Sequence, residues 1–403
     1  MTAVRKTTQA LGQDARRRLA WVAAAILAAA VSCWAMYQEI AAYRHPTVIL
    51  AGQDFWNNTW LALRELLSGA NIYAPTHAIV PGIEPAWPAS PHVPASLLWQ
   101  APFSAMPIPI ALFAFTLASI LAIWAGIFVL TRPAAPWAVV GTAACGAFAI
   151  GIGGGPETLL LGQPTGFMLL GLAILVRARR AWLAGLGFML AATTLQTGLP
   201  LALALLVLNG WPVLWRGMSL ILGCSALPVG LEVANSGLSH LVTSFTASAA
   251  VHLGRQSNRI DLGVLLRALG VSAVDLQVAA GIALLCGCLA YLARLPREAR
   301  RMDNPAVLCL VVSVTLLCTY HQYYDMLLVG AGLAPVVLIV DRSWRMLPCF
   351  GLAVVGATLA AYDFRDVTTP LCLIGVAAAS AVAVRMATRR DVAAEIPTLI
   401  LAG

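Results

Sequence analysis

Residues 16–40 read RRRLAWVAAAILAAAVSCWAMYQEI, which is three arginines followed by a run of mainly apolar residues. A helix of about 20 apolar residues is long enough to cross the hydrocarbon core of a bilayer. Arginines beside a span favour the cytoplasmic side, and no convincing small-residue cleavage site for a signal peptide follows. The stretch therefore predicts a first membrane span over residues 20–40, preceded by a cytoplasmic tail over residues 1–19.

The rest of the chain has the same character. Hydrophobic residues make up 60% of the 403 residues and charged residues only 10%, and apolar runs recur as far as Arg385. A soluble domain of this length could not bury so much apolar sequence, so the composition predicts an all-α polytopic membrane protein. The net charge of +8 comes from basic residues dispersed among short loops. Such dispersed charge indicates membrane topology rather than nucleic-acid binding.

Alternation of arginine clusters with apolar runs predicts the remaining topology. Residues 182–208 are expected to form two short, broken spans, because arginines flank both ends and Gly198-Leu199-Pro200 interrupts the run. Together the runs make roughly a dozen helices in one integral membrane domain over residues 1–403. Outer loops are expected at 42–94 and 235–270, and a cytoplasmic tail at 386–403. The other spans are expected near 110–131, 135–152, 159–176, 217–234, 272–293, 305–320, 326–340, 346–362 and 369–385.

Asp54 is the most informative polar residue, because Asp and Glu together number only 17 in the chain. It follows the first span, and a carboxylate at the mouth of a membrane domain is costly to dehydrate, so such groups usually pair, bind or react. The alternative is a solvated loop residue or a helix N-cap. Downstream, residues 60–67 have apolar residues at helical spacing, which predicts a short amphipathic helix in the membrane interface.

Two further clusters lie in segments expected on the outer face. Gln163 opens a span after Leu161-Gly162, and its amide can bind a sugar hydroxyl or a neighbouring helix. Arg255 and Arg259, which flank Asn258, are four residues apart. On a helix this spacing puts both guanidinium groups on one side, where they can clamp a phosphate or form a solvated basic face near lipid headgroups.

The last cluster is His321-Gln322-Tyr323-Tyr324-Asp325, at the expected outer end of a span. Ionisable groups at such a depth are usually functional. A purely structural pair of His321 and Asp325 is the alternative.

These clusters together resemble glycosyltransferase family 87, a branch of the GT-C type of membrane enzymes, from the first span to about Val340. In that family an aspartate in the first outer loop leads into an aromatic helix ending in Gly-x-x-x-Tyr. A Gly-Gln pair opens a later span, a Ser-Asn element lies in the large outer loop, and a His-x-x-Tyr-Asp element follows. The matching residues are Asp54, Gly69 and Tyr73, Gly162 and Gln163, Ser257 and Asn258, and His321, Tyr324 and Asp325.

Two positions differ from the family pattern. This chain has Pro91-His92-Val93-Pro94 where the family often has Tyr-Pro-Pro, and Leu195-Gln196-Thr197 where it often has a lysine.

The resemblance implies a GT-C bundle in the cell membrane, with both termini cytoplasmic. It implies an inverting glycosyltransferase that moves a mannose- or arabinose-like sugar from a polyprenyl-phosphate donor to a lipid-linked or cell-envelope glycan on the outer face. Membrane lipids are the other expected partner. No metal or other cofactor is expected, because positive side chains can stabilise a monophosphate leaving group. The implied roles are base for Asp54, phosphate stabilisation for His321, Arg259 and Arg255, and substrate positioning for Gln163, Asn258, Tyr324 and Asp325.

Two other classes of protein compete with this interpretation. A secondary transporter or lipid flippase also uses spans broken by Gly and Pro, as in residues 198–200. Transporters usually show paired halves, however, whereas the polar residues here gather towards one face. A structural scaffold for envelope assembly is the third possibility.

Overall fold

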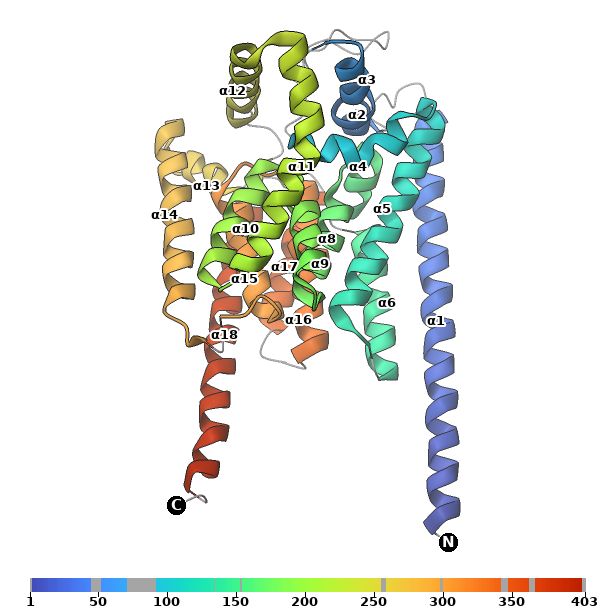
Figure 1. Ribbon diagram of the computed structural model, residues 1–403. Helices are drawn as coiled ribbons and strands as arrows, with labels where there is room; N and C mark the ends of the chain where they lie inside the picture. Colours follow the sequence, from blue (N-terminus) through green and yellow to red (C-terminus); the bar gives the residue numbers. More distant parts are fainter. Residues whose placement is uncertain are drawn as a thin grey trace.

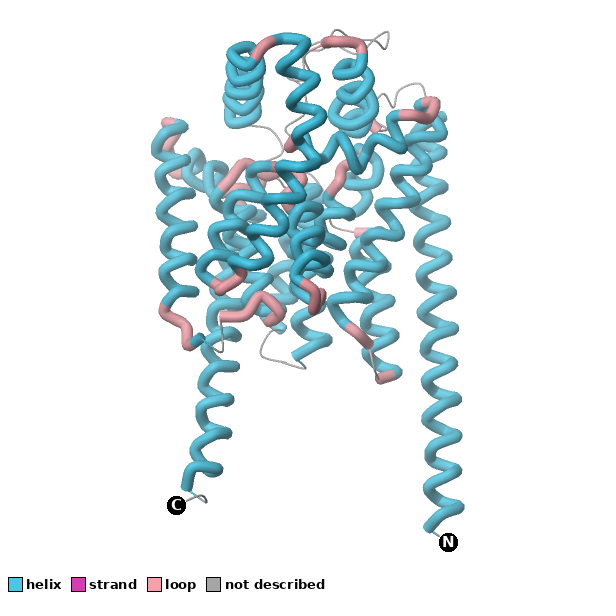
Figure 2. The backbone as a smooth tube through the Cα atoms, viewed as in Figure 1, coloured by secondary structure: helices cyan, strands magenta, loops and turns pink. Residues whose placement is uncertain are grey.

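The computed structural model describes residues 2–44, 52–70, 92–133, 135–152, 154–254, 259–297, 300–341, 347–361 and 367–400. Within these ranges the chain is helical, and its only β-type contacts are two isolated bridges, His92 with Thr194 and Arg259 with Gln322. Figure 2 shows the helices in cyan, joined by short loops. The predicted all-α class is confirmed for the described residues.

The elements follow the chain as α-helices, with two π-helices (η1 and η4) and a 3₁₀ turn (η3). They are α1 (Thr2–Arg44), α2 (Gln53–Phe55), η1 (Trp56–Leu61), α3 (Ala62–Leu67), α4 (Pro94–Ser104), α5 (Ile108–Thr131), α6 (Pro136–Gly151), α7 (Gly155–Leu161), α8 (Thr165–Arg177), α9 (Ala181–Ala191), α10 (Leu195–Val207), α11 (Trp211–Ser236), α12 (Leu238–Gly254), α13 (Leu262–Ala268), α14 (Val274–Ala293), α15 (Pro305–Cys318), η3 (Tyr323–Asp325), η4 (Leu327–Leu333), α16 (Ala334–Asp341), α17 (Leu347–Ala361) and α18 (Thr368–Ile400).

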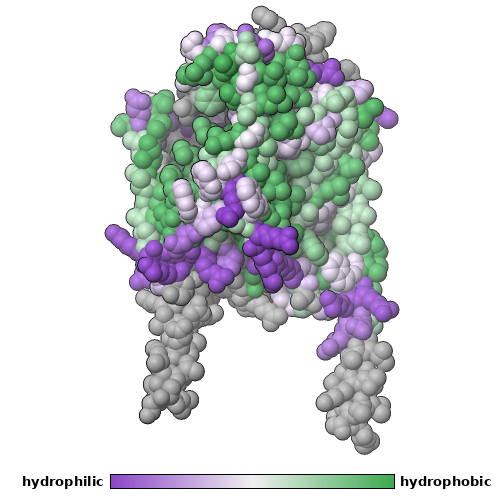
Figure 3. All heavy atoms as spheres, in the orientation of Figure 1, coloured by the Kyte–Doolittle hydropathy of each residue, from purple (hydrophilic) through white to green (hydrophobic). Residues whose placement is uncertain are grey.

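Both termini lie at one end of the bundle, and α2, α3 and α12 lie at the opposite end with the last part of α11 (Figure 1). We call this second group of helices the cap. Figure 3 shows a broad apolar surface between the cap and a hydrophilic band near the termini, as expected for a membrane protein. Exposed large apolar side chains on the long helices include Leu121 of α5, Trp215 of α11 and Ile282 of α14.

Fewer helices than predicted are long enough to cross a membrane. In the described part of the chain five helices meet that criterion by length and composition, within α1, α5, α11, α14 and α18. A sixth would be α6 with α7, which are bent by 52° at their junction. The remaining apolar helices, such as α8, α9 and α15, are shorter. A bundle of a dozen spanning helices is therefore not confirmed.

The core is built largely from these short helices. In α15 every residue from Pro305 to Leu317 is buried, which is the pattern of a helix that is apolar on all sides and sits inside other helices. It packs against α18, α14 and α10. Short helices suffice here because their neighbours, rather than lipid, cover them.

The predicted break at Gly198-Leu199-Pro200 is wrong in position. The chain breaks earlier, at residues 192–194 between α9 and α10, and Pro200 lies inside α10. Proline has no N–H to donate to the carbonyl four residues back, which here belongs to Gln196. The hydroxyl of Thr319 donates to that carbonyl instead, at 3.2 Å, so α10 continues through the proline.

The helix predicted over residues 60–67 is confirmed as part of a continuous helical run from Gln53 to Leu67. The large outer loop predicted over 235–270 contains two helices, α12 and α13. The proline-rich residues 71–91 of the first predicted loop lie outside the described residues.

Candidate active site

Asp54 sits in α2 at the start of the run that continues as the π-helix η1. The next residue, Phe55, is fully buried and packs on Phe115 with ring centroids 4.8 Å apart. Two residues before Asp54, Gly52 has a φ of +71° and donates its N–H to the carbonyl of Leu160 at 2.6 Å. A left-handed turn and an aromatic anchor therefore fix the backbone on both sides of the carboxylate.

Gln163 donates a hydrogen bond from Nε2 to Oδ2 of Asp54. The preceding residue, Gly162, ends α7 with a φ of +68°, and a Cβ on it would lie 2.4 Å from Cβ of Phe55. Only glycine fits that contact and that backbone conformation. The Gly-Gln pair found in the sequence thus brings the amide to the carboxylate across 109 residues of chain.

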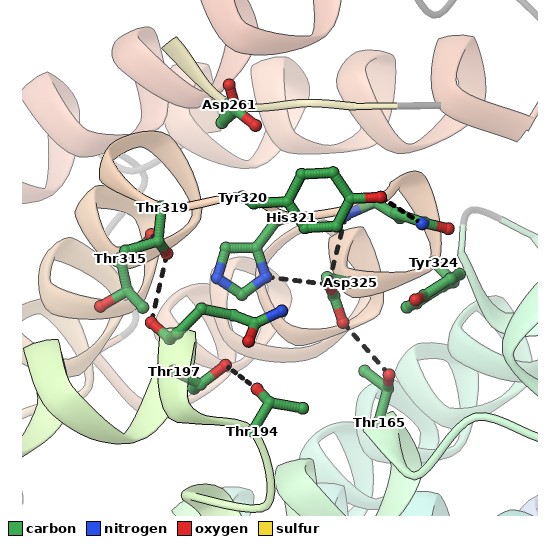
Figure 4. A network of polar contacts seen from close by, with 12 residues as sticks. Thr165, Thr194, Thr197, Asp261, Thr315, Thr319, Tyr320, His321, Tyr324 and Asp325 are labelled. Carbon is green, nitrogen blue, oxygen red and sulfur yellow. Dashed lines mark hydrogen bonds and ion pairs between the residues drawn. The ribbon is translucent and has the colours of Figure 1, made fainter. Parts of the chain in front are cut away.

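His321 and Asp325 form a buried pair, with Nδ1 of the imidazole 2.8 Å from Oδ2 of the carboxylate. Thr165 donates to the other carboxylate oxygen at 3.3 Å. Figure 4 shows the two bonds meeting at Asp325, with Tyr324 close by. Nε2 of His321 is buried and has no hydrogen-bond partner among the described residues. Because Asp325 holds Nδ1, any further hydrogen bond of this imidazole is made through Nε2.

Tyr324 is near enough to the carboxylates of Asp54 and Asp325 to be affected by both charges. Burial, and next the charges of Asp325 and Asp54, raise the pKa of Tyr324 well above its ordinary value of 10. Its phenol is therefore protonated at neutral pH and can donate a hydrogen bond.

Arg259 belongs to a segment that pairs with the backbone of His321 and Gln322. The N–H of Ile260 donates to the carbonyl of His321 at 3.1 Å. The guanidinium of Arg259 forms a bidentate pair with the carboxylate of Asp261, with N–O distances of 2.7 and 2.8 Å. Its central carbon, Cζ, lies 5.3 Å from the ring centroid of Tyr320. Arg255 and Asn258 lie outside the described residues.

A pocket with about 510 Å³ of empty space, its open mouth included, joins most of these groups. Four predicted site residues line it: Asp54, Gln163, Tyr324 and Asp325. Neither His321 nor Arg259 is among the lining residues, and His321 contacts the pocket wall through Asp325. The pocket is lined by Asp54, Asn58, His92, Gln163, Pro164, Thr165, Met168, Thr194, Gln196, Tyr320, Gln322, Tyr324 and Asp325.

Sequence reasoning missed several of these lining residues as site residues. For Asn58 the available signal is its spacing of four from Asp54 in a helical segment. His92 and Gln196 stand at the two positions where the chain differs from the family pattern. Thr194 precedes Gln196 at the helix break, a location that no sequence rule predicted.

A row of hydrogen bonds holds η1 against α4. The hydroxyl of Thr59 donates to Oε1 of Gln100 at 2.7 Å, and the hydroxyl of Ser104 donates to the carbonyl of Thr59 at 3.0 Å. Nε1 of Trp60 donates to the carbonyl of Met106 at 2.8 Å. These bonds fix the helical turn that follows Asp54.

We expect Thr59→Val to lower the melting temperature in detergent, because the buried Oε1 of Gln100 loses its donor, at a cost of about 1–3 kcal/mol. Combining it with Gln100→Leu should restore much of the loss, since both partners are then apolar and of similar size. A double variant whose destabilisation equals the sum of the two single losses would show that this hydrogen bond is not their source.

The described residues contain no group of three or more His, Cys, Asp or Glu side chains arranged to hold a metal ion. Two carboxylates and the neutral donors around them instead suit proton transfer and hydrogen bonding to hydroxyl groups.

The chain matches the family model described as glycosyltransferase family 87 over residues 92–319, which is more than half of its length. Gln163 and Arg259 lie inside that segment, whereas Asp54 and His321 lie outside it. No curated protein and no solved structure matches the chain. The family favours an enzyme over a transporter or a scaffold. The chain therefore belongs to glycosyltransferase family 87, as its motifs indicated, and is a membrane glycosyltransferase.

Proposed function

We propose that this protein is an inverting enzyme that takes a mannose- or arabinose-like sugar from a polyprenyl-phosphate donor. The acceptor is a lipid-linked or cell-envelope glycan, and the reaction occurs on the outer face of the cell membrane. One observation carries the proposal: Asp54, Gln163, Tyr324 and Asp325 line a single pocket. The pocket-lining segments lie towards the cap and away from the termini (Figure 1), which agrees with cytoplasmic termini and an outer site.

In this proposal Asp54 is the general base. Its carboxylate takes the proton of an acceptor hydroxyl while that oxygen bonds to the anomeric carbon of the sugar. The bond from the anomeric carbon to the phosphate oxygen breaks on the opposite side, and the lipid phosphate leaves with the electron pair. Gln163 orients the base through its hydrogen bond to Oδ2. A phenol such as Tyr324 can donate to a sugar oxygen.

The leaving phosphate requires positive donors. We propose His321 for this role, because an imidazolium has a donor on each nitrogen and can keep its bond to Asp325 through Nδ1 while Nε2 donates to a phosphate oxygen. For Arg259 we propose the same role. A guanidinium presents five N–H donors in a planar fork, which suits the oxygens of a phosphate. Arg255 and Asn258 remain proposed phosphate and sugar contacts outside the described residues.

The function is tested by comparing lipid-linked glycans from cells with and without the protein by mass spectrometry. We expect one glycan to lose a single hexose or pentose when the protein is absent and to regain it on expression of the parental chain. An unchanged glycan profile, together with no sugar transfer from polyprenyl-phosphate donors to membrane extracts, would contradict the proposal.

We also propose that transfer needs no divalent metal, because the leaving group is a monophosphate that protein cations can stabilise. Initial rates in excess EDTA should equal those in buffer. The pair Asp363 and Asp366 has the Asp-x-x-Asp spacing and lies outside the described residues. Loss of activity in EDTA that magnesium or manganese restores, and that Asp363→Asn with Asp366→Asn reproduces, would overturn this prediction and assign a metal to that pair.

A further inference from the structure

We propose that Asn58 and His92 bind the sugar ring of the acceptor, forming a subsite for a hydroxyl-rich glycan beside Asp54. This inference rests on the proposed function and adds where each substrate lies. Both residues line the pocket, and neither belongs to the predicted catalytic set.

The first argument is the common helical face of Asp54 and Asn58. They are four residues apart, and both reach the pocket although α2 changes to the π-helix η1 between them. Residues at this spacing are neighbours along one side of a helix, and π-helical turns often occur at functional sites. A base must contact the acceptor hydroxyl that it deprotonates. A side chain one turn further along the same face therefore meets the neighbouring hydroxyls of the acceptor.

The second argument is the rigid placement of His92. The residue is only 4% exposed, and its backbone forms an isolated bridge with Thr194. The N–H of Val93 donates to the carbonyl of Thr193 at 2.9 Å. The start of α4 is thus tied to the break between α9 and α10, and the imidazole is held where it lines the pocket.

The third argument is the polar face of α4 behind this wall. Ser96, Gln100 and Ser104 follow one another at a spacing of four along α4, His92 lies two residues before the helix begins, and all four are buried. Gln100 accepts from Thr59, the residue after Asn58. Asn58 and His92 therefore belong to two segments that a hydrogen bond between side chains holds together, which fixes them relative to one another.

The chemistry of this wall suits a glycan. An amide and an imidazole offer both donors and acceptors, as hydroxyl groups require. The residues next to the His321–Asp325 pair, including Gln322 and Tyr324, line the pocket as well. We assign the segment containing that pair to the donor phosphate and the Asn58–His92 wall to the acceptor sugar.

The test measures binding of two kinds of probe to the full chain in lipid nanodiscs. Octyl mannoside and octyl arabinoside represent the acceptor sugar, and farnesyl phosphate represents the lipid phosphate. We expect Asn58→Ala and His92→Phe each to weaken glycoside binding by roughly 2- to 10-fold, the loss of one neutral hydrogen bond. Farnesyl phosphate should bind all these variants as it binds the parent. His92→Gln, which keeps a donor and an acceptor, should bind the glycoside more tightly than His92→Phe.

Asn209→Gly is the matched control. Asn209 is exposed and lies two residues after the C-terminal end of α10, whereas Thr194 precedes the N-terminal end of that helix. The φ of Asn209 is +58°, a backbone conformation that glycine adopts readily. It should bind both probes normally. If an alanine at position 58 prevents folding, Asn58→Ser supplies the second variant.

The inference would be overturned if Asn58→Ala and His92→Phe both bound the glycosides as tightly as the parent does. It would also be overturned if the parent bound neither glycoside, or if these variants lost binding of farnesyl phosphate only. In those cases the proposed function survives if the parent still transfers sugar from a polyprenyl-phosphate donor. If the parent transfers no sugar, the proposed function fails whatever the binding data show.

Discussion

Asp54→Asn should lower the rate of sugar transfer by about 10²–10⁴-fold, the range expected when a general base is removed. Asparagine has nearly the same shape as aspartate, so the helical run from Gln53 to Leu67 should remain folded. It cannot take a proton from the acceptor hydroxyl. The measurement is the initial rate of transfer by purified variant and parent in the same detergent, with melting temperatures from the same preparations.

Asp303→Asn provides the matched control. Its carboxylate pairs with Arg301 at 2.6 Å on an exposed surface, where ion pairs contribute little to stability. We expect parental rates and a parental melting temperature. Asp54→Asn protein that is folded and transfers sugar at the parental rate would remove Asp54 from the mechanism.

His321→Ala should raise the barrier to transfer by about 2–4 kcal/mol, the effect of removing one donor that stabilises developing charge. This corresponds to a loss of roughly 30- to 10³-fold in turnover. Arg259→Ala should lower turnover to a similar extent. The losses should not add in the double variant, because both groups serve one phosphate. Initial rates of the two single variants and the double variant, at saturating acceptor, test this.

A purely structural role for either residue predicts a different pattern. The melting temperature would fall, while the folded fraction would turn over normally. Arg259→Ala needs particular attention here, because it leaves the buried Asp261 without its bidentate partner, and an unpaired buried charge is strongly destabilising. Arg259→Ala combined with Asp261→Ala removes both charges and separates this effect from catalysis. Normal turnover in His321→Ala would exclude His321 from the site.

Sequence reasoning found the centre of the candidate site because its residues fall in short motifs. Asp54 and Gln163 stand out as polar residues in an apolar chain, and they are hydrogen-bonded to one another. For residues 321–325 the sequence also allows a structural pair of His321 with Asp325, and the two side chains are hydrogen-bonded in the structure. Whether these residues catalyse transfer stays a prediction.

Tertiary contacts explain what the sequence could not predict. Because proline usually ends a helix, the sequence predicts a broken span at Gly198–Pro200. No local rule could reveal that Thr319, more than a hundred residues away, takes over the orphaned carbonyl of Gln196. Likewise, Arg259 pairs with Asp261 in an extended segment before α13, which helical periodicity does not describe. The predicted number of spans is not confirmed, because buried short helices and spanning helices have the same apolar composition.

The distribution of the pocket along the chain has a consequence for biosynthesis. Asp54 lies just after the first helix, whereas Asp325 lies just after α15, so 271 residues separate the two carboxylates. At a synthesis rate of about 5–20 residues per second, roughly 15–50 s pass between their emergence from the ribosome. During that interval the polar groups around Asp54 must be kept apart from lipid by water or by the insertion machinery. A ribosome that stalls before Asp325 leaves a membrane-inserted product that contains Asp54 but lacks the side of the pocket formed by Asp325. Cells would have to degrade this product.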